Sequence, residues 1–261
     1  MKNYFLAGLI LITTTSFLGL NKNEYPPIIT RHDKDDADFI ELAKRFQKVM
    51  CHLNLPDCEG TIIDDNWAVS AAHCSIEIQE KLKRGEKHFV IINEMEFEVD
   101  RVIIHRKWKK DEAYDIALLH FKGKPIGIMH AELYKTEDEM DKIVYMVGKG
   151  DKGDGLIGIN GNDGILRAAT NKVEEATDYW LKWTFDNPDT QSNYLTEYEG
   201  ISGPGDSGGP AFILRGEKIY IAGISSGQST KNSGGIEGVY GVKEYYTRVS
   251  QYIKWIERKI K

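Results

Sequence analysis

The sequence lacks an excess of positive charge, and it lacks any long apolar run after its first residues. Its 34 Lys and Arg residues are outnumbered by 40 Asp and Glu residues, which gives a formal net charge of −6 at pH 7. This balance argues against nucleic acid as a partner. No later stretch approaches the ~20 apolar residues of a membrane-spanning helix, so we expect no stable membrane anchor.

The one early apolar run, from Tyr4 to Ile12, follows Lys2 and precedes small and polar residues. This order is typical of a secretory signal peptide. We therefore expect a signal peptide over residues 1–20, with approximate cleavage, and a spacer over residues 21–36. No cysteine near the expected cleavage site could carry a lipid. The chain is thus predicted to be secreted or periplasmic.

Cysteine is scarce, with three residues in the chain. In an exported protein, an odd count indicates one disulfide and one remaining thiol. Cys58 and Cys74 flank a strand–turn–strand pattern and are the natural pair. Closing their loop would contribute roughly 3 kcal/mol in the chain-entropy model. Cys51 follows Val49 and Met50 and is expected to be a buried free thiol.

Histidine is absent after position 130, and this absence decides how the glycine-rich stretch 203–210 is interpreted. Its single hydroxyl belongs to Ser207, which lies in a Gly-x-Ser-x-Gly pattern. In an α/β-hydrolase, the catalytic histidine follows the serine. Because no histidine follows Ser207, that order is excluded and the order His, Asp, Ser is permitted. The alternative is a glycine-rich turn without a chemical role.

A serine nucleophile needs a base, and the base in turn needs a group that orients it. The candidate base is His73, which ends the apolar run Trp67–Ala72. The candidate orienting group is Asp115, at the head of the apolar segment Ile116–Leu119, where it would select the imidazole tautomer. Each residue taken alone has a simpler interpretation: His73 as a structural histidine, and Asp115 as an aspartate that caps a strand.

The rest of the chain consists mostly of short β-rich runs separated by polar or glycine-rich connections, which favours an all-β barrel or sandwich. Residues after Asp36 are expected to form a short helix, and Val249 to Ile260 an amphipathic helix. The loop Gly148–Gly164 contains seven glycines and several carboxylates. Calcium binding is conceivable there, but the spacing does not match an EF-hand, and a plain loop is the favoured interpretation.

Three segments together, Ser70–Cys74, Asp115–Leu119 and Gly205–Pro210, resemble the chymotrypsin/trypsin family of serine endopeptidases. The resemblance runs from about Gln47 to the C-terminus. Some of its segments are more similar to bacterial secreted members than to animal digestive ones. It implies two six-stranded antiparallel barrels packed together, with a C-terminal amphipathic helix. The peptidase domain would cover residues 37–261, with barrels at about 45–128 and 129–248 and the terminal helix at 249–261.

The resemblance also implies site roles. Ser207 would attack a peptide carbonyl, His73 would take its proton, and Asp115 would orient His73. The N–H groups of Gly205 and Ser207 would form the oxyanion hole, and Ser226 would lie beside Asp115 and the substrate. No metal or cofactor is required, and the expected partners are protein or peptide substrates of a monomer.

Several positions depart from the family pattern. The specificity position is Ile201 rather than an acid, so Arg or Lys is not expected before the cleaved bond. Gln228 replaces a glycine and would narrow the pocket, and Glu244 could also project into it. These residues predict a preference for an apolar or small residue there.

The segment that would be cleaved on activation also departs from the family pattern. In the family, Asp206 would pair with a new Ile or Val amino terminus, yet Ile28 and Ile29 follow Pro27, a poor site for a trypsin-like activator. The leading hypothesis is a secreted serine endopeptidase, and the alternative is a catalytically silent homologue that acts as a binding module.

Overall fold

A six-stranded closed barrel is formed by the first half of the chain in the computed structural model, which describes residues 28–261 except residue 57 and residues 110–112. Its strands follow the order β2-β3-β4-β7-β6-β5. Their bounds are Met50–His52 (β2), Glu59–Asp64 (β3), Trp67–Ser70 (β4), His88–Ile92 (β5), Met95–Ile104 (β6) and Ala117–Phe121 (β7). Pairing of His52 with Ile91 closes the barrel. The expected signal peptide lies outside the described residues.

The second half forms a larger, curved sheet with the order β12-β9-β16-β17-β18-β14-β13, and β8 pairs with β17. The bounds are Glu132–Leu133 (β8), Ile143–Gly148 (β9), Arg167–Lys172 (β12), Glu175–Ala176 (β13), Trp180–Thr184 (β14), Pro210–Arg215 (β16), Lys218–Ser229 (β17) and Lys243–Arg248 (β18). Strands β12 and β14 do not pair through their backbones. A side-chain hydrogen bond links them instead, from the Asn171 amide to the Thr184 carbonyl at 2.9 Å. The predicted all-β, two-barrel fold is therefore confirmed, with a second unit that has more than six strands and an open ladder.

A small four-stranded sheet joins the start of the described chain to this second unit. Its order is β11-β10-β1-β15, formed by Gly158–Gly161, Lys152–Asp154, Ile29–Thr30 and Gly200–Ile201. Ile28 and Ile29 are buried, so this part of the expected spacer is packed into the core. The glycine-rich loop 148–164 likewise supplies two strands.

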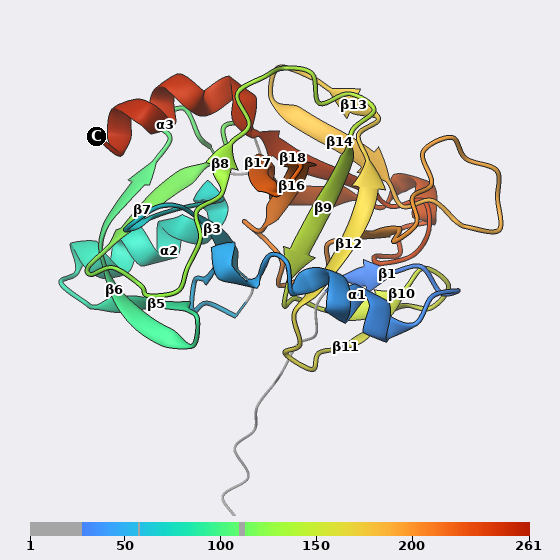
Figure 1. The fold of residues 1–261 in the computed structure, drawn as a ribbon, viewed down its shortest axis with the longest axis horizontal. Coiled ribbons are helices and arrows are strands. Elements are labelled where there is room, and N and C mark those ends of the chain that lie inside the picture. The colour runs from blue at the N-terminus through green and yellow to red at the C-terminus, as the bar shows by residue number, and fades with distance from the viewer. Residues whose placement is uncertain (1–27, 57, 110–112) are drawn as a thin grey trace, which may run out of the picture.

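Three α-helices lie in the described chain: α1 (Asp36–Ala43), α2 (Ala72–Lys83) and α3 (Ile253–Lys259). Short 3-10 turns occupy Gln47–Val49, Lys231–Ser233 and Val249–Tyr252. The sequence pattern predicts α1 and α3 but misses α2, which follows β4 directly. Figure 1 shows α3, in red, beside the green strands of the first barrel, and Ile256 is buried in the core there.

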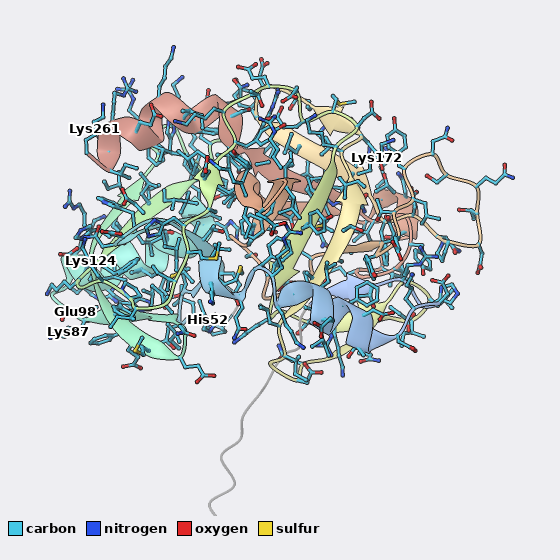
Figure 2. The ribbon with its side chains drawn as sticks, viewed as in Figure 1. His52, Lys87, Glu98, Lys124, Lys172 and Lys261 are labelled. Carbon is cyan, nitrogen blue, oxygen red and sulfur yellow. A yellow bond between two sulfur atoms is a disulfide. The ribbon has the colours of Figure 1, made fainter. Side chains whose placement is uncertain are left out.

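The core joins the two units. Phe46, before the first barrel, stacks on Phe212 of β16 with ring centroids 5.3 Å apart. Charged side chains cover the outside, as Figure 2 shows for Lys87 and Glu98 on the first barrel. None of the helices in the described residues is both long enough and apolar enough to cross a membrane.

Candidate active site

Ser207 lies on a tight turn between β15 and β16. Gly205 and Gly208 on either side of it have φ angles of +102° and +75°, which glycine adopts without strain. A Cβ at Gly208 would collide with the Ser70 hydroxyl. The Glu59 N–H donates to the Ser207 carbonyl at 2.8 Å, so β3 of the first barrel holds the turn of the second unit in place.

His73 lies in the first turn of α2, where Asp115 fixes it twice. Its Nδ1 is 2.7 Å from Asp115 Oδ2, and its backbone N–H donates to Asp115 Oδ1 at 2.9 Å. Because an ionised carboxylate only accepts hydrogen bonds, Nδ1 carries the proton. The other ring nitrogen, Nε2, is then free to accept one.

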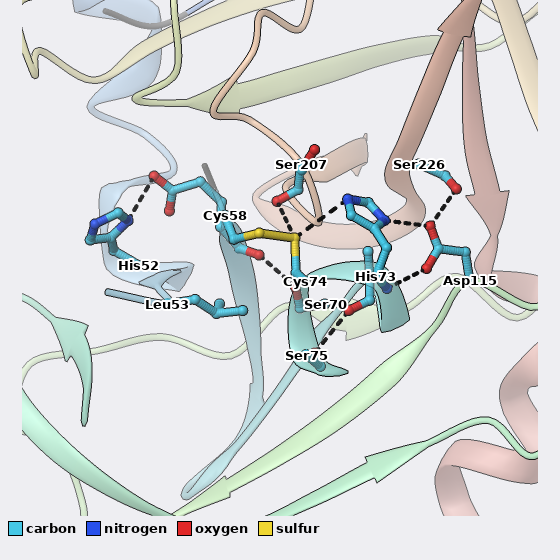
Figure 3. Close-up of a disulfide and its surroundings, with 12 residues drawn as sticks. His52, Leu53, Cys58, Ser70, His73, Cys74, Ser75, Asp115, Ser207 and Ser226 are labelled. Carbon is cyan, nitrogen blue, oxygen red and sulfur yellow. Dashed lines mark hydrogen bonds and ion pairs between the residues drawn. A yellow bond between two sulfur atoms is a disulfide. The ribbon is translucent and has the colours of Figure 1, made fainter. Parts of the chain in front are cut away.

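Asp115 is 3% exposed, and strands of the second unit complete its environment. Ser226 of β17 donates to Asp115 Oδ2 at 2.6 Å, and Thr247 of β18 donates to the Asp115 carbonyl at 2.9 Å. Figure 3 shows His73 and Ser226 converging on the same carboxylate. The interface of the two units therefore sets the orientation of His73.

Ser207 and His73 lie on either side of Cys74. The Cys74 sulfur is 3.5 Å from His73 Nε2 and 3.5 Å from the Ser207 carbonyl oxygen (Figure 3). Both residues are described, and no hydrogen bond joins the Ser207 hydroxyl to His73 Nε2 within the described part of the chain. Such a bond is often long or misaligned without substrate and tightens in the complex.

The disulfide between Cys58 and Cys74 is present, as predicted, with the two Cα atoms 5.9 Å apart. It connects the residue before β3 to α2, one residue after His73. Cys51 is a buried free thiol, also as predicted. Burial raises the pKa of the Cys51 thiol, which disfavours a reactive thiolate.

The predicted specificity pocket is crowded with polar side chains. Gln228 donates from its amide to the Ser202 carbonyl at 2.6 Å and to Glu244 Oε1 at 3.1 Å. Glu244 is completely buried, and it also accepts from Trp183 Nε1 at 2.9 Å. Burial raises the pKa of Glu244 to about 7. Ile201 has no exposed surface and belongs to the core of the second unit.

Asp206 points away from the solvent into a closed nest of N–H groups. Its carboxylate accepts from Gly150 at 2.6 Å, Gly203 at 2.8 Å and Ile28 at 3.2 Å. The residue is 1% exposed, and burial raises its pKa to about 7. Side chains at Gly148 or Gly150 would collide with Asp206, which explains the glycines there. Of the two candidate amino termini, Ile28 provides the nitrogen that meets Asp206.

The comparisons with known proteins agree with this geometry. A profile of the trypsin family, described as "Trypsin", matches residues 42–256. The chain belongs to the trypsin family. Among similar relatives are proteins named chymotrypsin-like elastase family member 1. The one from Macaca fascicularis is 26% identical over 215 residues, covering 78% of each chain. That from Homo sapiens is 27% identical over 217 residues, covering 78% of this chain and 81% of the relative.

The relative from Canis lupus familiaris is 28% identical over 218 residues, with 78% of this chain and 81% of the relative covered. These trypsin-family relatives are mammalian, so the expected closeness to bacterial secreted members is not supported. That prediction was based on a few short segments, which are a weak guide because loop sequences vary more among relatives than the core does.

Two contacts of this trypsin-family site were not anticipated from the sequence. Thr247 holds the Asp115 carbonyl, and Ser70 donates to the Glu59 carbonyl at 2.7 Å beside Ser207. Ser70 belongs to a segment that carries the family resemblance and ends the apolar strand β4, so its small polar group was the available signal. Thr247 lies on β18, which also contains Lys, Glu and Arg, and no comparable signal marked it.

For the loop 148–164, a plain loop was the favoured interpretation and a calcium site the alternative. Asp163 forms salt bridges with Lys152 at 3.1 Å and Arg167 at 2.9 Å, and Asp154 accepts the Leu156 N–H at 2.8 Å. These two carboxylates therefore already have donors. The cluster of possible metal ligands found among the described residues, Asp64, Asp65 and His130, lies elsewhere.

Proposed function

We propose that this trypsin-family protein is a serine endopeptidase that hydrolyses peptide bonds through an acyl-enzyme. The observation that supports this most is the doubly fixed His73, whose Nδ1 faces the buried Asp115 carboxylate while Nε2 faces the Ser207 turn. Ser226 donates to the same carboxylate, so the position of the group that orients His73 is fixed as well.

In the proposed reaction, Ser207 Oγ attacks the carbonyl carbon of the peptide bond while His73 Nε2 takes its proton. Asp115 stabilises the imidazolium that forms. The proton then passes to the leaving amine, the C–N bond breaks, and water hydrolyses the ester with His73 acting as base. The N–H groups of Gly205 and Ser207 would stabilise the oxyanion, and each such donor typically contributes about 2.7–4 kcal/mol.

We propose a small residue at P1, the position before the cleaved bond. Gln228 and Glu244 fill the region that a large side chain would enter, and they bond to each other and to Ser202. A large apolar P1 side chain would displace Gln228 and leave the buried Glu244 carboxylate with fewer donors, which is costly. Glycine or alanine would leave these bonds intact.

We further propose that the mature chain begins at Ile28. A free ammonium at Ile28 would give the buried Asp206 carboxylate a cation in place of a neutral peptide N–H. Ile28 also has φ of +49°, an unfavourable value for a β-branched residue. Cleavage before Ile28 would remove that constraint. Since Pro27 precedes Ile28, the cleaving enzyme must accept proline before the bond.

Export remains part of the proposal. The Cys58–Cys74 disulfide supports it, because disulfides persist in oxidising compartments and are rare in the cytosol. The proposed substrates are polypeptides.

The function is tested by hydrolysis of fluorogenic peptides with Ala at P1, using protein that starts at Ile28. We expect turnover that disappears in Ser207→Ala and persists in the matched Ser229→Ala variant. Turnover that survives in Ser207→Ala would exclude Ser207 as the nucleophile. A folded protein without any turnover on a peptide library would favour the silent, binding homologue.

A further inference from the structure

A groove of about 640 Å³ is lined by the end of β6, residues 105–107, Tyr114, and α3 with the turn before it, and the proposed reaction does not use it. Five cationic side chains line it: Arg106, Lys107, Lys254, Arg258 and Lys259. None of the described residues that line it carries a carboxylate. The chain as a whole has a net charge of −6, so the positive charge of this groove is opposite in sign to that of the protein.

These cations differ from the other basic residues of the surface. Lys87 pairs with Glu98, Lys124 with Asp65, and Lys135 with Glu257. Within the described residues, by contrast, none of the five groove cations forms a salt bridge. Figure 2 shows Lys87 and Lys124 on the first barrel, away from Lys261 near the end of α3. No salt bridge among the described residues therefore offsets the positive charge of this groove.

The walls of the groove are aromatic and apolar as well as cationic. The rings of His105 and Tyr114 stack 5.1 Å apart, and Trp255 and Tyr252 meet His105 edge-on at 5.1 and 5.5 Å. The Tyr252 hydroxyl is buried without a hydrogen-bond partner of good geometry among the described residues. A ligand that fits must carry apolar groups and acceptors as well as negative charge.

The positive charges of the groove act on a titratable group inside it, His105. Burial, Lys107 and Arg106 together lower the pKa of His105, which disfavours a charged imidazole there. Lys107 lies 5.1 Å from the centre of the Tyr114 ring. The charges that face a ligand therefore come from the Lys and Arg side chains.

The groove is connected to the candidate active site through the chain, because Tyr114 lines it and immediately precedes Asp115. Its aromatic walls match the aromatic side chains of a peptide, which favours a peptide over a sulfated polysaccharide.

We propose that this groove is an exosite that binds an acidic segment, interspersed with aromatic side chains, of the polypeptides that the protein cleaves. The substrate relationship rests on the proposed function, whereas the binding itself does not. Carboxylates of the segment pair with the cations of α3 and of residues 106–107. Its aromatic side chains pack on Trp255 and Tyr114, and the exosite thereby raises the local concentration of such substrates at the cleft.

Binding is tested with Ser207→Ala protein, so that catalysis plays no part. The probe is the fluorescein-labelled peptide Glu-Glu-Tyr-Asp-Phe-Glu-Glu, followed by fluorescence anisotropy, and the control peptide replaces each Glu by Gln and Asp by Asn. The exosite variant adds Lys254→Ala and Arg258→Ala. The matched control adds Lys87→Ala and Lys124→Ala, which remove the same charge elsewhere. Circular dichroism and Tm check that each variant folds.

We expect saturable binding of the acidic peptide that weakens by at least about tenfold in the exosite variant, as for the loss of two charge contacts. The control variant changes binding less than twofold, and added salt weakens it. Equal loss in both variants, or absence of saturable binding, would overturn the exosite. So would binding of a heparin-derived sulfated oligosaccharide without binding of the peptide. Failure of peptide hydrolysis by the unmutated protein refutes the proposed function alone.

Discussion

Moving the amino terminus to Ile28 is the change that we expect to alter stability in the most distinctive way. In a chain that starts at Asn21, the nitrogen that meets Asp206 is a neutral peptide N–H at 3.2 Å. In a chain that starts at Ile28, the same position holds an α-ammonium group. The two forms share every other described contact, so a comparison isolates this one interaction.

The magnitude follows from the burial of Asp206. Burial raises the pKa of this carboxyl from 3.8 to about 7 in the chain without the ammonium. The folded state then binds more protons than the unfolded state between about pH 4 and 7, so stability falls as the pH rises through this window. At about 1.4 kcal/mol per pKa unit, the complete loss is roughly 4 kcal/mol, of which roughly 3 kcal/mol falls between pH 4.5 and 7.

An α-ammonium group at Ile28 changes the pH dependence of the stability. A cation beside the carboxylate lowers the pKa of Asp206 and raises its own pKa above the usual ~8 of an α-amino group. The stability that it contributes is fully present below about pH 8 and is lost as the pH rises through the raised value. The Ile28 form should therefore keep its stability between pH 4 and 7, where the Asn21 form loses it.

The assay is urea unfolding of both forms at pH 4.5 and 7, in Ser207→Ala protein to prevent self-cleavage. Burial also raises the pKa of Glu199 to about 8 and of Glu244 to about 7, but both forms share these groups and the difference cancels them. We expect the two forms to diverge by roughly 3 kcal/mol on going from pH 4.5 to 7, and Asp206→Asn to abolish the divergence. Equal pH dependence, within about 1 kcal/mol, would refute the ammonium model.

Three further substitutions have definite expected results. Asp115→Asn places an amide donor against His73 Nδ1 and favours the wrong tautomer, so kcat on a fluorogenic peptide should fall about 10⁴-fold, and a fall of less than tenfold would contradict that role. Gln228→Gly should raise kcat/KM for a Phe P1 peptide relative to an Ala P1 peptide by about tenfold, whereas an unchanged ratio would show that Gln228 does not limit the pocket. Replacing Cys58 and Cys74 together by Ser should lower the free energy of unfolding by about 3 kcal/mol for a sequence separation of 16, and a loss below about 1 kcal/mol in urea unfolding would be too small for this loop.

Much of the architecture was predictable because its signals are local. Phe97 and Val99 alternate with Glu96 and Glu98 in β6, and alternation of this kind follows directly from the pleat of a strand. The Cys58–Cys74 pair and the grouping of His73 with Asp115 were also predictable, since residue types and their order restrict the chemistry strongly. Whether the grouped residues catalyse a reaction stays a prediction.

Helix α2 shows a signal that was present but overlooked. Cys74, Ile78 and Leu82 are spaced by four residues, and Gly85, with φ of +77°, follows the helix end. The apolar run before His73 reads as a strand, and this concealed the abrupt change to a helix at Ala72.

Other features depend on contacts between distant segments, and no local pattern contains them. The pairing of Gln228 with Glu244 crosses a long connection and follows a register shift between Ser225 and Gly227. The position of Ile28 requires residues near 150, 203 and 206 to form one nest. In both cases the candidate residues could be listed from the sequence, but only the tertiary contacts show which of them meet.

The central claim is that Ser207 is activated by His73 and Asp115. The most direct measurement treats protein that starts at Ile28 with a fluorophosphonate and locates the adduct by peptide mass spectrometry. The account predicts one adduct, on Ser207, that forms at least about 10³-fold more slowly in His73→Ala. An adduct on another residue, or none on correctly folded protein, would contradict it.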